Sequence, residues 1–185
     1  LWPAGAKPAA CIGCPYATRK DAFVPGWGYL AARHIRIGER PGGCESGTCH
    51  CPQRAHERLK PFVGPSGKHL GKATTESGEG AFTTNVRKCN VAGKEDKEAK
   101  RASIAHCVAA YLQPELDAID AAQKAAGIKR AVVSPIGADA TRAVLNRGNM
   151  QKLHGSVFTR AEVEAMAQAD APVDEEEEGE DAASA

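Results

Sequence analysis

Cysteines are the residues of this chain with the clearest chemical potential, and there are seven of them in 185 residues. Cys11 and Cys14 form a Cys-x2-Cys pair, a spacing that lets two thiolates converge on one metal ion or cluster. Cys89 and Cys107 lie far from that pair in the sequence and could complete a set of four thiolates. The alternative for any single cysteine is a buried, small apolar side chain.

A second group of metal-binding residue types is crowded into one short segment, and its members are Cys44, Cys49, His50, Cys51 and His56. The cysteine count is odd and no charged-then-apolar signal peptide opens the sequence, so we expect a cytoplasmic protein in which metal ligation is favoured over disulfides. Thiolate and imidazole suit zinc, which makes Cys44, Cys49, Cys51 and His56 a candidate zinc site and a zinc-binding regulatory protein one hypothesis. The alternative is a flexible insertion whose cysteines are incidental.

Three other segments carry groups suited to binding a base or a phosphate. Glu39 stands in a Gly-Glu-Arg-Pro-Gly turn after an apolar run, where a carboxylate can act as a base or position water. Phe62, between Pro and Gly turns, could offer a flat stacking face, and a helix start at Ser66 could offer N–H groups to a phosphate. Asn85 can donate and accept at once, as reading a base edge requires. The alternatives are a solvated glutamate, a core phenylalanine and a turn-forming asparagine.

The elements that must position these groups are strands alternating with helices. Apolar runs predict strands at 34–37, 81–86, 131–133 and 157–158, and the continuous run at 131–133 is typical of a strand buried on both faces. Helical spacing or composition predicts helices at 66–73, 98–112, from 114 onward and at 139–145, with Cys107 on the buried face of the second. We therefore expect an α/β three-layer sandwich, with a central, mainly parallel four-stranded sheet flanked by helices.

The charge of the chain is unevenly distributed. The 24 Lys+Arg and 23 Asp+Glu residues give a net charge of +1, yet seven of the acids lie at 174–181 and the remainder carries +8. A basic body predicts contact with a polyanion such as a nucleic acid.

No run of about 18 apolar residues occurs, which excludes a membrane span. We expect residues 1–160 to form one domain and residues 161–185 to form an Ala/Glu-rich, acidic, disordered tail.

Taken in order, several segments resemble the uracil-DNA glycosylase superfamily, most closely its iron–sulfur, family 4-like members. They are Cys-Ile-Gly-Cys-Pro-Tyr, Val-Pro-Gly-Trp-Gly, Gly-Glu-Arg-Pro-Gly, Pro-Phe-Val-Gly-Pro-Ser-Gly and Thr-Thr-Asn-Val-Arg-Lys-Cys, and weaker similarity extends the match over residues 11–158. The resemblance implies a base-excision repair enzyme that flips uracil out of DNA and hydrolyses its N-glycosidic bond. It implies a structural 4Fe–4S cluster held by Cys11, Cys14, Cys89 and Cys107. We expect a monomer whose partner is uracil-containing DNA, with no membrane.

The same resemblance implies a role for each residue of the base-binding site. Phe62 would stack on the uracil ring, and Asn85 would hydrogen-bond its polar edge and exclude cytosine. Glu39 would position the attacking water at C1′ of the sugar. The backbone at Gly38 and Gly42 would shape the floor of the pocket.

Contacts with the DNA backbone are implied for Arg87 and Lys88, beside the cluster, and for the helix start at Ser66; ordinary surface charge is the alternative for the two cations.

One departure from the family concerns the leaving group. The family uses the His of a His-Pro loop to stabilise the uracil anion, and no His-Pro dipeptide occurs in this sequence. Losing such a donor commonly lowers the rate on the order of 10²–10³-fold. An impaired glycosylase and a catalytically inactive DNA-binding module on the same fold are therefore both open.

Overall fold

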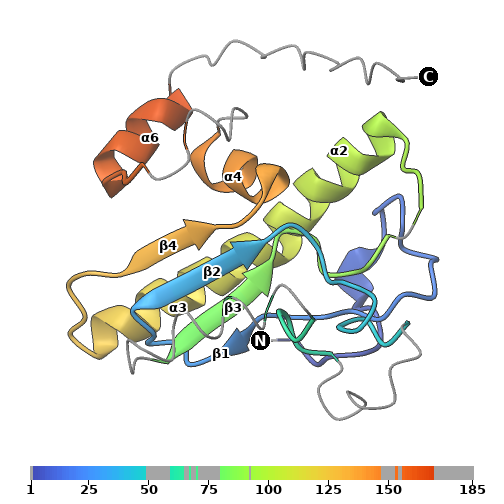
Figure 1. Ribbon diagram of the computed structural model, residues 1–185, viewed down its shortest axis with the longest axis horizontal. Helices are drawn as coiled ribbons and strands as arrows, with labels where there is room; N and C mark the ends of the chain where they lie inside the picture. The colour runs from blue at the N-terminus through green and yellow to red at the C-terminus, as the bar shows by residue number, and fades with distance from the viewer. Residues whose placement is uncertain are drawn as a thin grey trace, which may run out of the picture.

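The computed structural model describes residues 2–48, 59–64, 67, 70, 80–91, 93–146, 153 and 156–168. Figure 1 shows how its helices and strands are arranged. In chain order they are η1 (Ala9–Cys11), β1 (Trp27–Gly28), β2 (His34–Gly38), β3 (Ala81–Asn85), α2 (Lys97–Cys107), the π-helical turn η3 (Val108–Leu112), α3 (Gln113–Ala125), β4 (Val132–Pro135), α4 (Ala138–Leu145) and α6 (Arg160–Gln168).

The four strands form one sheet in the order β1-β3-β2-β4. Strand β2 is parallel to β3 and to β4, whereas β1 pairs with β3 in the antiparallel direction. The α/β class and the mainly parallel four-stranded sheet predicted from the sequence are confirmed (Figure 1). The predicted strand at 157–158 is wrong: Val157 is 93% exposed and in no strand, and the fourth strand is instead β1. With only two residues, β1 is too short for an alternating pattern to reveal it.

The helical segment α2–η3–α3 runs without a break along one side of the sheet (Figure 1). It begins after Asp96, whose carboxylate accepts a hydrogen bond from Ala99 N at 2.9 Å. Within η3 the winding widens, because Gln113 N donates to Val108 O, five residues earlier. Pro114 follows in the first turn of α3, where its missing N–H is tolerated. The change of winding agrees with the prediction that Pro114 starts or kinks the next helix.

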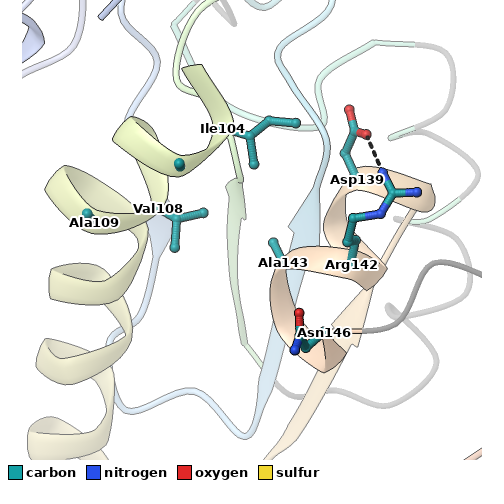
Figure 2. A pocket seen from close by; sticks show the side chains of 8 residues that line it. Ile104, Val108, Ala109, Asp139, Arg142, Ala143 and Asn146 are labelled. Atoms are coloured by element: carbon teal, nitrogen blue, oxygen red, sulfur yellow. Dashed lines mark ion pairs between the residues drawn. The ribbon is translucent and has the colours of Figure 1, made fainter. Parts of the chain in front are cut away.

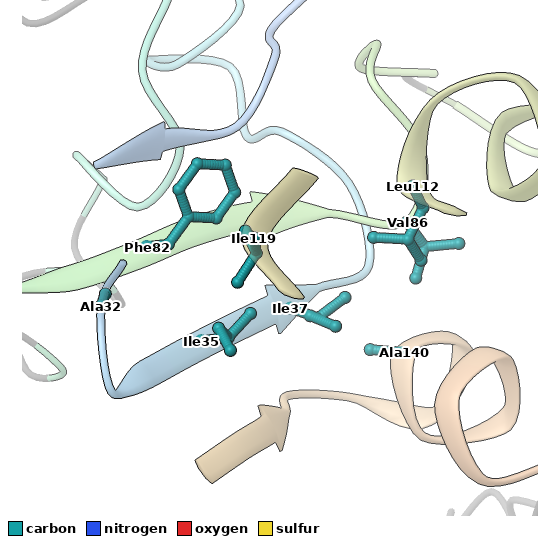
Figure 3. Packing of buried hydrophobic residues seen from close by; sticks show 8 residues of the cluster. All are labelled: Ala32, Ile35, Ile37, Phe82, Val86, Leu112, Ile119 and Ala140. Carbon is teal, nitrogen blue, oxygen red and sulfur yellow. The ribbon is translucent and has the colours of Figure 1, made fainter. Parts of the chain in front are cut away.

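The apolar core lies between the sheet and the helices α3 and α4 (Figure 3). Ile35 and Ile37 of β2 and Phe82 of β3 pack together there with Ile119 of α3 and Ala140 of α4. Each large apolar side chain buried in this way contributes about 1.5–3 kcal/mol relative to exposure. This packing fixes the positions of the strand ends.

The register of the parallel strands brings two important positions side by side. Gly38 at the end of β2 is paired with Asn85 at the end of β3. Because side chains alternate along a strand, Arg36 and Gly38 belong to the face opposite the one that Ile37 presents to the core. The carboxyl ends of parallel strands are where α/β proteins commonly bind ligands. The edge at Gly38 and Asn85 is therefore a candidate ligand-binding position.

Strand β4 does not fit the prediction that it is buried on both faces. Val132 is 55% exposed and Val133 is 41% exposed. The reason is position: β4 is the last strand of the sheet and pairs only with β2. An apolar run therefore indicated a parallel strand correctly but not its burial.

The first part of the segment expected to be a disordered tail is helical instead, since α6 occupies Arg160–Gln168. Residues 169–185 lie outside the described part of the chain. Within that part, no helix combines the length and apolar character needed to cross a bilayer.

Candidate functional site

Three residues predicted to bind a base are gathered at the carboxyl edge of the sheet. Gly38, Phe62 and Asn85 are so close that a Cβ atom added to Gly38 would clash with Asn85 Oδ1 and would lie 2.7 Å from Cζ of the Phe62 ring. Only glycine therefore allows this packing at the end of β2. A ring face and an amide come together here from a loop and a strand that are distant in sequence.

The amide of Asn85 has a donor that no described residue uses. Asn85 is 3% exposed, and within the described part of the chain its Nδ2 atom has no hydrogen-bond partner. Leaving such a buried donor unpaired costs about 1–3 kcal/mol. A ligand that presents an acceptor beside Phe62 would remove this penalty, which makes the edge of Asn85 the strongest indication of a binding site in the described residues.

The loop that carries Phe62 has a constrained backbone. Phe62 has a φ of 60°, in the left-handed region that L-residues seldom adopt. Gly67 packs directly on the Phe62 carbonyl, where a Cβ would overlap it. On the other side of the loop, Lys60 Nζ lies 4.3 Å from the centre of the Trp27 ring, a cation–π contact with β1. These contacts hold the Phe62 ring over the strand edge.

Glu45 is a positioning residue that the sequence did not single out. Its side chain is buried, and its carboxylate accepts hydrogen bonds from the backbone of Phe62, Val63 and Gly64. It also accepts one from Gly42 N at 3.2 Å. Burial raises the pKa of Glu45, and the backbone donors oppose that rise. Glu45 thus ties the turn after β2 to the Phe62 loop.

The position of Gly42 differs from the expected pocket floor. A Cβ at Gly42 would meet nothing within 4 Å, so the residue faces open space rather than Phe62 or Asn85. Its contribution is the N–H that it donates to Glu45.

Glu39 lies just beyond Gly38, at the start of α4. Its Oε1 atom accepts a hydrogen bond from Asp139 N at 3.1 Å. A Cβ at Gly137, whose φ is 100°, would lie 2.6 Å from Glu39 Cδ, so this glycine makes room for the carboxylate. A helix N-terminus stabilises a negative charge, which suits an ionised carboxylate. The arrangement holds Glu39 next to the base-binding edge with one oxygen fixed.

Arg87 and Lys88 are not placed as the phosphate contacts that the resemblance implied. Both side chains are buried, Lys88 completely. Arg87 forms an ion pair with Glu95, and Lys88 Nζ lies 2.6 Å from Glu115 Oε2. A buried cation that already has an anionic partner does not reach a DNA phosphate, so the expectation of surface contacts is corrected by this geometry.

The buried ion pair of Lys88 and Glu115 stabilises the backbone next to the candidate site. Lys88 Nζ also donates to the Asn85 carbonyl at 2.8 Å and to Thr84 Oγ1 at 2.6 Å. Glu115 Oε1 accepts from Gly26 N at 2.8 Å. The end of β3, the segment before β1 and helix α3 are therefore joined at one buried point. The sequence signal was an acid on the otherwise apolar face of α3 that includes Ile119.

The four cysteines predicted to bind a cluster are at least partly buried. Cys11, Cys89 and Cys107 are buried and Cys14 is half-buried. Burial and the neighbouring thiols raise the pKa of Cys89 to about 12, and burial also raises the pKa of Cys107. Cys11 Sγ lies 3.0 Å from Tyr111 Oη. Cys11 and Cys107 belong to the same cluster of buried residues, together with Phe23 and Tyr111.

The spacing of these thiols limits the metal ligands that they could hold. Among the described residues, no three His, Cys, Asp or Glu side chains are close enough together to bind a single metal ion. An iron–sulfur cube spreads its four thiolates further apart than one zinc ion does. The backbone N–H of Lys88 donates to Cys107, and hydrogen bonds to sulfur are typical of cluster ligands. The cysteines therefore offer the type of ligand that an iron–sulfur cluster needs, but the described residues do not form a metal site, and the cluster stays a prediction.

Some predicted site residues cannot be placed. Ser66 lies outside the described residues, and so do Cys49, Cys51 and His56 of the candidate zinc site. Cys44 is half-buried in the turn after β2. The zinc hypothesis stays a prediction.

A shallow cavity of about 410 Å³ lies elsewhere, between α2–η3 and α4. Figure 2 shows Ile104, Val108 and Ala143 on its walls and the ion pair of Asp139 and Arg142 beside it. Its lining includes neither Phe62 nor Asn85, so it is separate from the base-binding edge.

Comparison with known proteins does not add to this description. No protein-family model matches the sequence, and no match is found among curated proteins.

Proposed function

We propose that the protein acts on uracil-containing DNA as a glycosylase of the iron–sulfur, family 4-like kind. The observation that carries this proposal is the unpaired Nδ2 donor of buried Asn85, in contact with Gly38 and close to the Phe62 ring. A planar base could stack on Phe62 while a carbonyl oxygen on its edge accepts from Asn85. Uracil offers such an oxygen where cytosine carries an amino group, so the amide would select uracil.

Glu39 is the proposed group for activating water. Asp139 N holds its Oε1 atom, and among the described residues no hydrogen bond to Oε2 is found. A water molecule bound to Oε2 would attack C1′ of the sugar, giving its proton to the carboxylate. The C1′–N1 bond breaks, and its electron pair leaves with uracil. The residue thus matches the role that the resemblance implied.

Cys11, Cys14, Cys89 and Cys107 are the residues proposed to hold a 4Fe–4S cluster. When bound, the cluster would supply a rigid, thiolate-linked cross-link and no step of the hydrolysis. Cys89 follows the β3 end that carries Asn85, and Cys107 ends α2. The thiol ligands would therefore fix the N-terminal segment and α2 relative to the base-binding edge.

A catalytically inactive DNA-binding module is the second candidate. The observation that favours it is the absence of a His-Pro dipeptide from the sequence, because the related enzymes use that His on the leaving group. Such a module would retain base binding at Asn85 without cleavage.

One pair of measurements separates the two functions. Cluster-loaded protein is incubated with single- and double-stranded oligonucleotides containing one uracil, and both abasic product and DNA binding are measured. The proposal predicts abasic product that is lost in Glu39→Gln and retained in Glu98→Gln, whose glutamate is exposed on α2. Binding without product at high protein concentration would instead support the inactive module.

A further inference from the structure

Arg36 is a buried cation in the middle of strand β2. It is 9% exposed, and no residue that the structure describes is a hydrogen-bond partner of its Nη2 atom. Burial lowers the pKa of the guanidinium, and no acidic side chain contributes an opposing effect. Burying a charge without a partner is strongly unfavourable, and an anion bound next to it would offset this cost.

The side chain of Arg36 belongs to the face of the sheet where the base-binding residues lie. Ile35 and Ile37, its neighbours on β2, point into the core on the other face (Figure 3). Arg36 and Gly38 are two residues apart and share a face, about 6.6 Å along the strand. The Cβ direction of Gly38 leads to the Phe62 ring and to the Asn85 amide. Arg36 is therefore the residue that precedes Gly38 on this face of β2, on the side of the site toward the start of the strand.

Two buried side-chain donors without a partner in the described residues belong to this face, those of Arg36 and Asn85. In the described part of the chain, three buried side-chain nitrogen atoms lack a partner: Arg36 Nη2, Asn85 Nδ2 and Arg87 Nε. Arg87 already has Glu95 as an anionic partner. The other two would suit a ligand that offers two acceptors, one of them carrying negative charge.

We propose that Arg36 is a catalytic residue that stabilises the negative charge developing on uracil as the glycosidic bond breaks. This inference rests on the proposed function. When the C1′–N1 bond breaks, its electron pair enters the uracil ring and is shared with the carbonyl oxygens. A guanidinium donor close to one of those oxygens stabilises the anion more than the neutral base, which lowers the barrier. Arg36 would thus supply the charge stabilisation for which the sequence has no His-Pro loop.

The test is the single-turnover rate of uracil release by Arg36→Gln and Arg36→Lys. Removing the charge should lower the rate on the order of 10²–10³-fold while leaving the affinity for uracil-containing DNA within about threefold. Arg36→Lys keeps a cation and should have an intermediate rate. The matched control is Arg130→Gln, an exposed arginine just before β4, at the opposite edge of the sheet.

A second substrate distinguishes a catalytic role from a structural one. In 5-fluorouracil the fluorine stabilises the leaving anion, so the rate at which this base is released depends less on stabilisation by a cation. The rate deficit of the Arg36 variants should be smaller for 5-fluorouracil than for uracil, whereas a general structural defect would affect both equally. If Arg36→Gln does not fold, as judged by circular dichroism, the same comparison is made with Arg36→Lys.

The results distinguish a failure of the proposed function from a failure of the proposed role of Arg36. An inactive wild-type protein contradicts the proposed function itself. An active wild type with Arg36 variants as fast as Arg130→Gln, or with equal deficits on both bases, contradicts only the role of Arg36.

Discussion

Lys88 Nζ and Glu115 Oε2 lie 2.6 Å apart, with both side chains completely buried. The hydrogen-bond partners of this pair lie at the end of β3 and just before β1: Lys88 donates to the Asn85 carbonyl, and Glu115 accepts from Gly26 N and Thr84 Oγ1. An ion pair in this position is expected to matter for the shape of the site more than for net stability.

Breaking this ion pair from one side should be strongly destabilising. Glu115→Gln or Lys88→Met leaves one buried charge without its partner, and the expected loss is about 3–5 kcal/mol in the free energy of unfolding. Urea denaturation measures it. The control is Lys124→Met, which removes an exposed ion pair with Asp120 of the same 2.6 Å length and should cost at most about 1 kcal/mol. Equal losses in both variants would show that burial does not govern the effect.

A methyl group at Gly38 should block the base-binding site. In Gly38→Ala the new Cβ meets Asn85 Oδ1 and the Phe62 ring, so one of them has to move. We expect binding of uracil-containing DNA to weaken and product formation to fall at least on the order of tenfold, since misplacement by about 1 Å can cost more. Gly80→Ala is the matched control, because a Cβ there meets nothing within 4 Å. Unchanged activity in Gly38→Ala would place the site elsewhere.

Glu45 should control the order of the Phe62 loop. Glu45→Ala removes the acceptor for the amides of Phe62, Val63 and Gly64, and we expect these amides to exchange with deuterium faster than in the wild type. The expected loss of stability is about 1–3 kcal/mol. Glu45→Gln keeps an acceptor oxygen and should preserve much of the protection. Identical exchange in all three proteins would rule out this anchoring role.

The cluster-free protein should become less stable at high pH. Burial raises the pKa of Cys89 from 9.0 to about 12, so the unfolded thiol ionises first as the pH rises through that window. The folded state then binds more protons than the unfolded state, and stability falls by at most about 1.4 kcal/mol per pH unit for this thiol. Urea titrations at increasing pH above 9.0 measure the slope. Cys89→Ala should flatten it, and a slope unchanged by this substitution would refute the assignment.

The sequence predicted much of the fold and part of the site, for reasons that particular residues make clear. Strands β2 and β3 were predictable because Ile35, Ile37 and Phe82 follow the period of a strand. The exposure of Val132 was not, because apolar content does not tell an edge strand from a central one. The sequence also did not predict contacts between side chains that are distant along the chain.

Glu45 and Glu115 illustrate these unpredicted long-range contacts. Each glutamate acts through partners that only the folded chain brings to it, so the sequence did not identify these partners, although Glu115 stands on the apolar face of α3. For the same reason Lys88 resembled a surface cation in the sequence although its partner lies in α3.

The central claim is that Asn85 reads uracil beside Phe62, and single-turnover excision tests it most directly. Cluster-loaded wild-type protein and Asn85→Leu, which has a similar shape but no amide, are compared on oligonucleotides with a single uracil. The account predicts abasic product from the wild type and a loss on the order of 10²–10³-fold in the variant. Excision by Asn85→Leu at the wild-type rate, or no excision by the wild type, would contradict it.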